Sequence, residues 1–332
     1  MRIHITNIYG QSSKSVAMIA QNTTAEIAKS LGFNELAIYF YDINVDNSRE
    51  LSCRIDGILS GVANGDIVFF QSPTWNDMRY DEAFIAKLQA YRDIKIGIFV
   101  NDVLPLMFES NEYLLKRVVT LYNQASLLIV PSDRMLRFLQ KNGLTVRKTV
   151  IQQCWDYPTA AHLEIPMAKP YLNFIGNPEK FEFVRNWQYE FPLHLFTAPT
   201  EIVKGNVTFE GWQYTTNLIS KLSKGGWGLV WAQGHVKKYM EMCVSYKLST
   251  YLAAGIPVIV EEDLSNQEII RKNDLGLVVE SLEQAINILK HMTPADYQAK
   301  AANVKRFSFL LREGYFTKKF LLDAVHKILQ NS

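Results

Sequence analysis

The stretch SYKLSTYLAAGIPVIVEE, residues 245–262, combines a helix start, a tight turn and a buried strand. Its hydroxyl groups and Lys247 gather where the helix begins, and small residues follow up to Gly255. Pro257 then leads into a β-branched run at residues 258–260. Free backbone N–H groups at a helix start carry partial positive charge, and a nearby lysine adds a full one. From this spacing alone, a phosphate site and an ordinary capped core helix are equally good interpretations.

Short apolar segments alternate with helical patterns on both sides of a proline-bearing stretch at residues 155–170, which reads as an interdomain linker. Strands are expected at 2–8, 36–41, 66–70, 95–100, 126–130 and 149–153, and then at 171–175, 193–197, 207–210, 228–231, 257–260 and 276–279. Short strands that alternate with helices predict parallel sheets. We therefore expect an α/β protein with two Rossmann-like, doubly wound domains facing a cleft, where ligands of such sheets bind.

The bulk composition narrows the class of protein. The chain has 332 residues, 48% of them hydrophobic and 20% charged, with a net charge of +2 and no long Lys/Arg block, so a nucleic-acid partner is not expected. Three scattered cysteines and six scattered histidines predict neither a disulfide framework nor a metal site. The start of the chain, MRIHITNIYG, resembles a strand and a glycine loop rather than a signal peptide, and no apolar run is long enough to span a membrane. We expect a cytoplasmic protein.

Two further clusters fall in the second half of the chain. In FIGNPEKFEFV, residues 174–184, a strand ends in a turn and Lys180 begins the next helix, although an exposed lysine on a surface turn is the more common situation. In EGWQYTTNL, residues 210–218, Trp212 or Tyr214 could lie against a flat base, or both could be ordinary core aromatics.

Three clusters fall in the first half. The loop YGQSSKSV, residues 9–16, lacks both GxGxxG and GxxxxGKS, so it is neither a dinucleotide fingerprint nor a P-loop, and we expect it to line the cleft. Asp102 follows a buried strand and could be a general base, a hydroxyl binder or a helix cap. SPTWND, residues 72–77, ends the neighbouring strand, and its tryptophan suits a sugar ring or ordinary packing.

The opening stretch resembles the nucleotide-binding motif of GT-B glycosyltransferases, K-L-x-x-Y-L-A-x-G-x-P-V-I. The likeness continues through FIGNPEKF, GGWGLVW at 225–231, VPSDRMLRFLQKNGL and LREGYFTKKFLLDAV, and so covers nearly the whole chain. With ITNIYGQS, FFQSPTW and VLPLMF, the pattern is similar to the glucosyltransferases that add the second sugar to serine-rich-repeat adhesins of streptococci and related bacteria.

The resemblance implies an N-terminal acceptor-side domain at 1–156 plus 307–332 and a C-terminal UDP-sugar-binding domain at 157–306, with the C-terminal helix crossing back to the first domain. It implies transfer of glucose from UDP-glucose onto N-acetylglucosamine O-linked to the adhesin, with no metal and no cofactor. A homo-oligomer, with a tetramer as one option, is also implied. Other UDP-sugars, such as UDP-galactofuranose or UDP-N-acetylglucosamine, and a non-catalytic sugar-nucleotide-binding subunit stay open as alternatives.

By position, the resemblance implies Lys247 and Lys180 as the catalytic phosphate cations, with Asp102 as a further catalytic candidate. The donor would be bound by Ser15, Val16, Lys180, Trp212, Gln213, Tyr214, Thr215, Ser245, Tyr246, Lys247, Leu248, Ser249 and Thr250. The acceptor would lie near Gly10, Thr74, Trp75, Asn101 and Asp102.

Two positions depart from the pattern of the resembled enzymes. Thr250 stands where many GT-B enzymes have a glutamate that holds the ribose hydroxyls, so ribose recognition must use hydroxyl or backbone groups here. Asn101 stands where relatives often have a histidine before the aspartate. Because an asparagine amide takes up no proton at neutral pH, a histidine base at this position is excluded.

Overall fold

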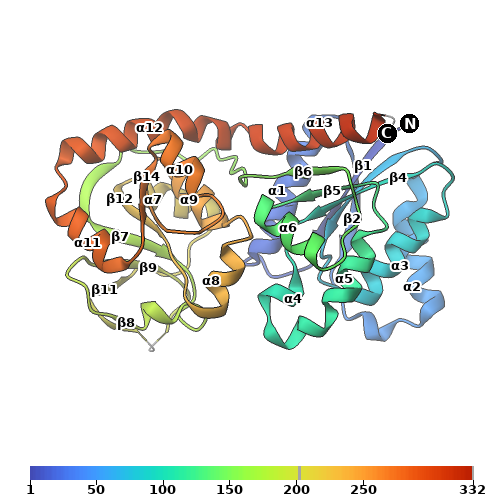
Figure 1. Cartoon of the computed structure of the whole chain (residues 1–332), viewed down its shortest axis with the longest axis horizontal. Coiled ribbons are helices and arrows are strands. Elements are labelled where there is room, and N and C mark those ends of the chain that lie inside the picture. Colours follow the sequence, from blue (N-terminus) through green and yellow to red (C-terminus); the bar gives the residue numbers. More distant parts are fainter. Residues whose placement is uncertain (201–202, 331–332) are drawn as a thin grey trace. The chain divides into compact units, whose positions relative to one another are not determined.

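The computed structural model describes residues 1–200 and 203–330 and divides the chain into two compact units. Unit 1 consists of Met1–Gln153 and the chain from Phe316 onward, and unit 2 consists of Cys154–Tyr315. The sequence predicted that the chain passes from one domain to the other after residues 156 and 306. Each unit contains a six-stranded parallel sheet with helices (Figure 1), so the predicted pair of doubly wound α/β domains is confirmed.

The sheet of unit 1 has the strand order β2-β1-β3-β4-β5-β6, with every pair parallel. Its strands are β1 (Ile3–Tyr9), β2 (Asn34–Tyr39), β3 (Ile67–Ser72), β4 (Lys95–Val100), β5 (Leu127–Val130) and β6 (Thr149–Ile151). All residues of β3 and β5 are buried, as expected of inner strands covered on both faces. The order reverses between β1 and β3, and ligands of such sheets bind at the carboxyl ends of the strands beside this point.

Four helices of unit 1 begin at side-chain caps that the sequence supplies, at Ser15, Asn47, Asp77 and Ser132. The helices of this unit are α1 (Val16–Ser30), α2 (Ser48–Ile58), α3 (Met78–Gln89), α4 (Leu104–Met107), α5 (Leu115–Tyr122), α6 (Asp133–Lys141) and α13 (Tyr315–Leu329), with short 3-10 turns at Ile43–Val45, Leu59–Gly61 and Glu109–Leu114. Asn47 and Glu50 form a complete capping box on α2, which satisfies backbone N–H groups at the helix start.

The C-terminal helix α13 returns to unit 1, as predicted. The ring of Phe320 lies 4.9 Å from the ring of Phe99 on β4. The Lys327 ammonium donates to the carbonyl of Thr149 on β6 at 2.7 Å. The last helix therefore contributes side chains to the core and sheet of unit 1.

The sheet of unit 2 has the strand order β11-β9-β7-β12-β13-β14 and is also parallel. Its strands are β7 (Met167–Ile175), β9 (Leu193–Phe196), β11 (Val207–Phe209), β12 (Gly225–Val230), β13 (Val258–Glu261) and β14 (Gly276–Val279), and β8 (Asn186–Trp187) pairs with β10 (Lys204–Gly205) in a small second sheet. The order reverses between β7 and β12, which predicts the binding edge of this unit at the carboxyl ends of those two strands.

Strand β7 begins inside the stretch that the sequence suggested was a linker. It starts at Met167, and its register against β12 shifts between Gly225 and Trp227. Proline lacks an N–H group and is accepted in sheets at such irregular positions, so Pro170 does not end the strand. The expected strand start at 171 was therefore too late.

The helices of unit 2 include the one predicted in the stretch SYKLSTYLAAG. They are α7 (Thr215–Leu222), α8 (Gly234–Met240), α9 (Tyr246–Ala254), α10 (Gln267–Asn273), α11 (Leu282–His291) and α12 (Pro294–Arg312), with a 3-10 turn at Glu182–Val184. Helix α9 ends at Gly255, whose φ of 89° is in the left-handed region that favours glycine. It lies so close to β12 that a Cβ on Gly228 would be 2.2 Å from the Tyr251 ring.

Candidate functional site

The start of α9 presents backbone groups without a side-chain cap. Ser245 precedes the helix in extended conformation, but its hydroxyl makes no capping hydrogen bond. The first N–H groups of a helix have no partner within it and attract anions. The start of α9 can therefore donate hydrogen bonds to an anionic ligand.

Lys247 lies in the first turn of α9 against two aromatic rings. Its Nζ is 4.2 Å from the centroid of Phe181 and 5.9 Å from that of Phe174, and these two rings pack edge to face at 5.2 Å. Burial and the nearby positive charge of Lys180 lower the pKa of the Lys247 ammonium to about 7. A phosphate would compensate both effects, because an opposite charge favours the charged amine.

Lys180 approaches the same ring from the turn after β7. Its Nζ is 5.9 Å from the Phe181 centroid, and its backbone N–H donates to the carbonyl of Asn177 at 3.0 Å. The turn includes Gly176, where a Cβ would lie 2.7 Å from Phe174 and 2.9 Å from Phe181. The structure thus brings Lys180 and Lys247 to one place, at the carboxyl end of β7 where the strand order reverses.

The segment before α7 is connected to the start of α9 through aromatic side chains. Thr215 makes a side-chain hydrogen bond with Tyr157, and the Tyr157 ring lies 5.5 Å from the Tyr246 ring. Trp155 lies 6.0 Å from Tyr246 and donates its indole N–H to the carbonyl of Val244 at 2.9 Å. This chain of contacts links two of the predicted donor-binding segments.

The remaining donor-side residues differ in how accessible they are. The rings of Trp212 and Tyr214 pack edge to face at 4.6 Å, Tyr214 is 64% exposed, and Gln213 donates to the carbonyl of Glu210 at 2.7 Å. Leu248 and Ser249 are buried. Thr250 is also buried, at 3% exposure, and its hydroxyl donates to the Tyr246 carbonyl at 2.9 Å.

In unit 1 the loop after β1 turns at Gly10. Its φ is 83°, and a Cβ there would lie 2.6 Å from the Tyr39 ring, so a side chain is disfavoured both by conformation and by space. Ser15 caps α1 by accepting from the N–H of Met18 at 3.2 Å and donates to Gln11 Oε1 at 2.6 Å. Val16 follows with an exposed side chain.

The loop after β3 is held by a buried carboxyl group. Thr74 donates its hydroxyl to Asp81 Oδ1 at 2.5 Å, and burial raises the pKa of Asp81 to about 7. Trp75 has a φ of 65°, and its buried indole N–H has no hydrogen-bond partner among the described residues. Backbone strain of this kind is concentrated at functional sites in proteins.

Asn101 and Asp102 follow β4, the strand beside β3. Their backbone N–H groups both point to the carbonyl of Ser72, at 2.9 and 3.4 Å. The Asn101 amide nitrogen donates to Gln71 Oε1 at 3.4 Å, and within the described part of the chain its oxygen has no partner. The predicted acceptor-side residues after β3 and β4 are therefore neighbours at one sheet edge.

Several residues around these positions were not identified from the sequence. Phe174 and Phe181 lie beside Lys247. The available signal was the segment FIGNPEKF, in which these two phenylalanines lie on either side of another lysine, Lys180. Tyr157 lay in the stretch interpreted as a linker. Gln71 is a polar residue in a buried strand, a pattern that indicates a specific hydrogen-bonding role.

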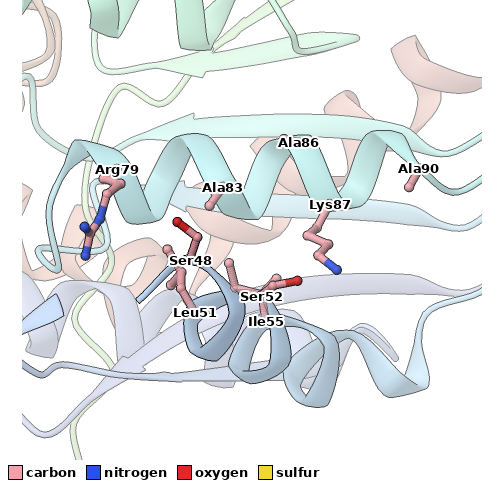
Figure 2. Close-up of a pocket in the computed structure, with 9 residues that line it drawn as sticks. All are labelled: Ser48, Leu51, Ser52, Ile55, Arg79, Ala83, Ala86, Lys87 and Ala90. Atoms are coloured by element: carbon pink, nitrogen blue, oxygen red, sulfur yellow. The ribbon is translucent and has the colours of Figure 1, made fainter. Parts of the chain in front are cut away.

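A surface cavity of about 390 Å³ lies between α2 and α3 of unit 1. Figure 2 shows its lining: Ser48, Leu51, Ser52, Ile55, Arg79, Ala83, Ala86, Lys87 and Ala90. Its two cations are engaged, Arg79 with the carbonyl of Ile43 at 2.6 Å and Lys87 with Asp56 at 2.7 Å. Both cations of the lining are therefore already bound to other groups of unit 1.

The described residues contain neither a metal-binding cluster nor a membrane-spanning helix. Across residues 1–200 and 203–330, no three His, Cys, Asp or Glu side chains gather in an arrangement that could hold a metal ion. Within the same ranges, no helix combines the length and the apolar character needed to cross a bilayer.

Two family models match the chain, one for each half. Residues 2–154 match the N-terminal domain of the glucosyltransferase 3-like family, and residues 172–324 match its C-terminal domain. The matched ranges together cover most of the chain.

Full-length relatives and a solved structure agree with these matches. The chain is 48% identical to glucosyltransferase 3 of Streptococcus gordonii, over 99% of this chain and 100% of the relative. It is 44% identical to glucosyltransferase 3 of Streptococcus parasanguinis, over 99% of both chains. The structure of Anabaena HepE in complex with UDP and glucose has a TM-score of 0.68 at 13% identity, covering 98% of this chain and 100% of HepE, which shows a shared GT-B fold.

Proposed function

The chain belongs to the glucosyltransferase 3-like family and is a glucosyltransferase with the GT-B fold, and on this premise we propose its substrates. It moves glucose from UDP-glucose onto N-acetylglucosamine that is O-linked to a serine-rich-repeat adhesin. In this reaction the bond from glucose C1 to the diphosphate breaks and a bond to an acceptor hydroxyl oxygen forms. UDP leaves with the electron pair, and the hydroxyl proton is released.

The observation that carries this proposal is the pair of lysines beside the uncapped start of α9. The leaving diphosphate gains negative charge in the transition state, so fixed positive groups accelerate its departure. Lys247, Lys180 and the first N–H groups of α9 supply such groups at the sheet edge where ligands bind. HepE, which shares the fold, was crystallised with UDP and glucose.

The same groups support a reaction without a metal ion or another cofactor. Two ammonium groups and a helix start together offer the charge that a divalent cation supplies in other phosphate sites. We propose that they replace it here. Adding a chelator should leave the transfer rate unchanged under this proposal.

The base and ribose of the donor are proposed to lie between the two linked segments of unit 2. Tyr214 is the exposed aromatic next to α7, and the contacts through Tyr157 keep this segment beside α9. Ribose would be bound by the Thr250 hydroxyl acting as an acceptor and by backbone groups, because no glutamate stands at this position. Ser15 and Val16 of unit 1 stay predicted donor contacts.

The acceptor sugar is proposed to lie at the carboxyl edge of the unit 1 sheet. Trp75, Asn101 and Asp102 bring an indole, an amide and a carboxylate to the ends of neighbouring strands, which suits a ligand rich in hydroxyl groups. Thr74 contributes by shaping the loop, since its hydroxyl is bound to Asp81. Asp102 is the proposed group that receives or orients the acceptor hydroxyl proton.

A transfer assay tests the proposal. Labelled UDP-glucose and a peptide carrying O-linked N-acetylglucosamine should yield a labelled peptide, and Lys247→Ala should lower the rate by about 10²–10³, the loss typical of removing one charge-stabilising group. Lys290→Ala is the matched control, because Lys290 is an exposed lysine of unit 2 paired with Glu190. Transfer by wild type with UDP-galactofuranose or UDP-N-acetylglucosamine but not with UDP-glucose would refute the donor assignment. Tight UDP binding without transfer from any UDP-sugar would instead favour a non-catalytic subunit.

The resemblance to this family also leads us to propose where the protein is located and how it assembles. A transferase that uses a cytoplasmic sugar nucleotide is expected in the cytoplasm, and a homo-oligomer, with a tetramer as one option, stays a prediction. Light scattering of the purified chain measures its oligomeric state.

A further inference from the structure

Gln71 is a buried amide whose orientation is determined by the backbone around it. The residue is 0% exposed on β3, and its Nε2 donates to the carbonyls of Thr6 at 2.8 Å and Gln21 at 3.1 Å. Both partners are acceptors only, so the nitrogen must face them and Oε1 must face the other way. The core of unit 1 thus determines the direction of this amide.

Gln71 in turn determines the direction of the Asn101 amide. Oε1 of Gln71 faces Nδ2 of Asn101 at 3.4 Å, and a flipped Asn101 would place two carbonyl oxygens against each other. The Asn101 oxygen consequently points away from Gln71. Asn101 is only 7% exposed, yet this oxygen has no partner anywhere in residues 1–200 or 203–330.

A second buried amide near the same sheet edge also has an oxygen without a hydrogen-bond partner among the described residues. Gln21 is fully buried, its nitrogen donates to the carbonyl of Pro73 at 2.9 Å, and its Oε1 also lacks a partner within the described chain. A buried acceptor without a partner costs free energy in folding, and such groups are rare except where a ligand or water completes them. Two such carbonyl oxygens near the ends of β3 and β4 indicate a ligand that donates hydrogen bonds.

We propose that Asn101 Oδ1 accepts a hydrogen bond from the acceptor sugar, and that Gln71 is the positioning residue that directs this oxygen toward it. The inference rests on the proposed function and names the atom that recognises the acceptor. A sugar carries two kinds of donor, a ring hydroxyl and, in N-acetylglucosamine, the acetamido N–H. Either one fits an oriented amide oxygen.

Steady-state kinetics with the full chain tests the role of Asn101. Asn101→Ala should raise KM for a peptide carrying N-acetylglucosamine by about tenfold, the effect of one lost hydrogen bond, while KM for UDP-glucose stays roughly unchanged. A peptide carrying glucose, which has a hydroxyl in place of the acetamido group, separates the two donors. A rise with both peptides assigns a hydroxyl, and a rise confined to the N-acetylglucosamine peptide assigns the acetamido N–H.

A double-mutant cycle tests Gln71. Gln71→Met removes the anchor of the Asn101 amide at nearly constant side-chain volume, so it should raise KM for the acceptor, and the double variant should be no worse than Asn101→Ala alone. A purely structural role would give additive losses. If Gln71→Met does not fold, Asn101→Ser, which keeps a small polar group but lacks the directed amide oxygen, gives the second measurement and should also raise KM for the acceptor.

The matched control is an asparagine whose amide is satisfied within the chain. Asn123 Oδ1 accepts from the N–H of Thr145 at 2.7 Å, and its nitrogen donates to the carbonyl of Gly143 at 2.9 Å. Asn123→Ala should leave KM for the acceptor unchanged. An unchanged acceptor KM in Asn101→Ala would overturn the inference, whereas absence of glucose transfer by wild type would instead refute the proposed function.

Discussion

Lys247 should take up a proton when the sugar nucleotide binds. Its pKa is lowered to about 7 by burial and by the charge of Lys180, so much of the unliganded protein carries a neutral amine at this position near pH 7. The diphosphate adds negative charge beside the amine and should return its pKa toward the ordinary value of about 10.4. Binding and protonation are therefore linked.

The size of the effect follows from the pKa of about 7. At pH 8 only about one tenth of the free protein has a charged Lys247, so binding takes up about nine tenths of a proton, against about one tenth at pH 6. UDP-glucose should consequently bind about tenfold more weakly at pH 8 than at pH 6, which is about 1.4 kcal/mol. The affinity falls as the pH rises because the bound state has the higher pKa.

Isothermal titration calorimetry measures both quantities. Titrations of UDP-glucose in two buffers with different ionisation enthalpies give the number of protons taken up at each pH. UDP-glucose is preferred to UDP because its diphosphate has no terminal group that titrates in this range. The catalytic turnover is avoided by leaving out the acceptor.

Two substitutions serve as controls. Lys247→Arg keeps a charge at every pH, so its affinity should not change between pH 6 and pH 8. Lys247→Met removes the charge and should bind weakly at both pH values. Equal proton uptake by wild type at pH 6 and pH 8 would refute the reasoning, because Lys247 would then be either already charged or distant from the phosphates.

Three further predictions concern other parts of the structure. Burial raises the pKa of Asp81 to about 7, so the folded state keeps a proton that the unfolded state releases near pH 4. The free energy of unfolding should therefore fall as the pH rises from about 4 to about 7, by up to about 1.4 kcal/mol per pH unit. Denaturation of Asp81→Asn at several pH values should lack this part of the pH dependence. Gly228→Ala should destabilise unit 2 by about 1–3 kcal/mol, because its Cβ would lie 2.2 Å from the Tyr251 ring; an unchanged melting temperature would contradict this packing. Asp102→Asn should lower kcat by about 10²–10⁴ if its carboxylate receives the acceptor proton, and full turnover would limit it to a positioning role.

The fold was predictable because its signals are local. The strands are short apolar runs, and glycines with positive φ, such as Gly255, mark where helices end. The errors arose where local signals are weak. Helix α8 has only seven residues and begins with glycine, so it was not expected. Strand β7 starts before Pro170, because a register shift in the sheet accommodates the proline.

The functional positions were predictable only in part. Lys247 and Lys180 stood out as lysines near helix starts, yet each had an ordinary interpretation when taken alone. The structure distinguishes Lys247 from a solvated lysine, because it is partly buried with its Nζ 4.2 Å from the centroid of Phe181. Lys180 is exposed and approaches the same ring at 5.9 Å. The role of Gln71 was not predictable, since no local pattern in FFQSPTW reveals which backbone carbonyls its amide will contact.

The stretch at 245–262 illustrates what the sequence determines by itself and what depends on the tertiary structure. By itself the sequence determined a helix from its hydroxyl-rich start to Gly255 and a buried strand after Pro257, because these depend on residues adjacent in the chain. Only the tertiary structure decided what surrounds Lys247: the ring of Phe181, the charge of Lys180 and the partial burial that lowers its pKa. Those effects act through space between residues more than sixty positions apart, and the parallel sheet is what brings them together.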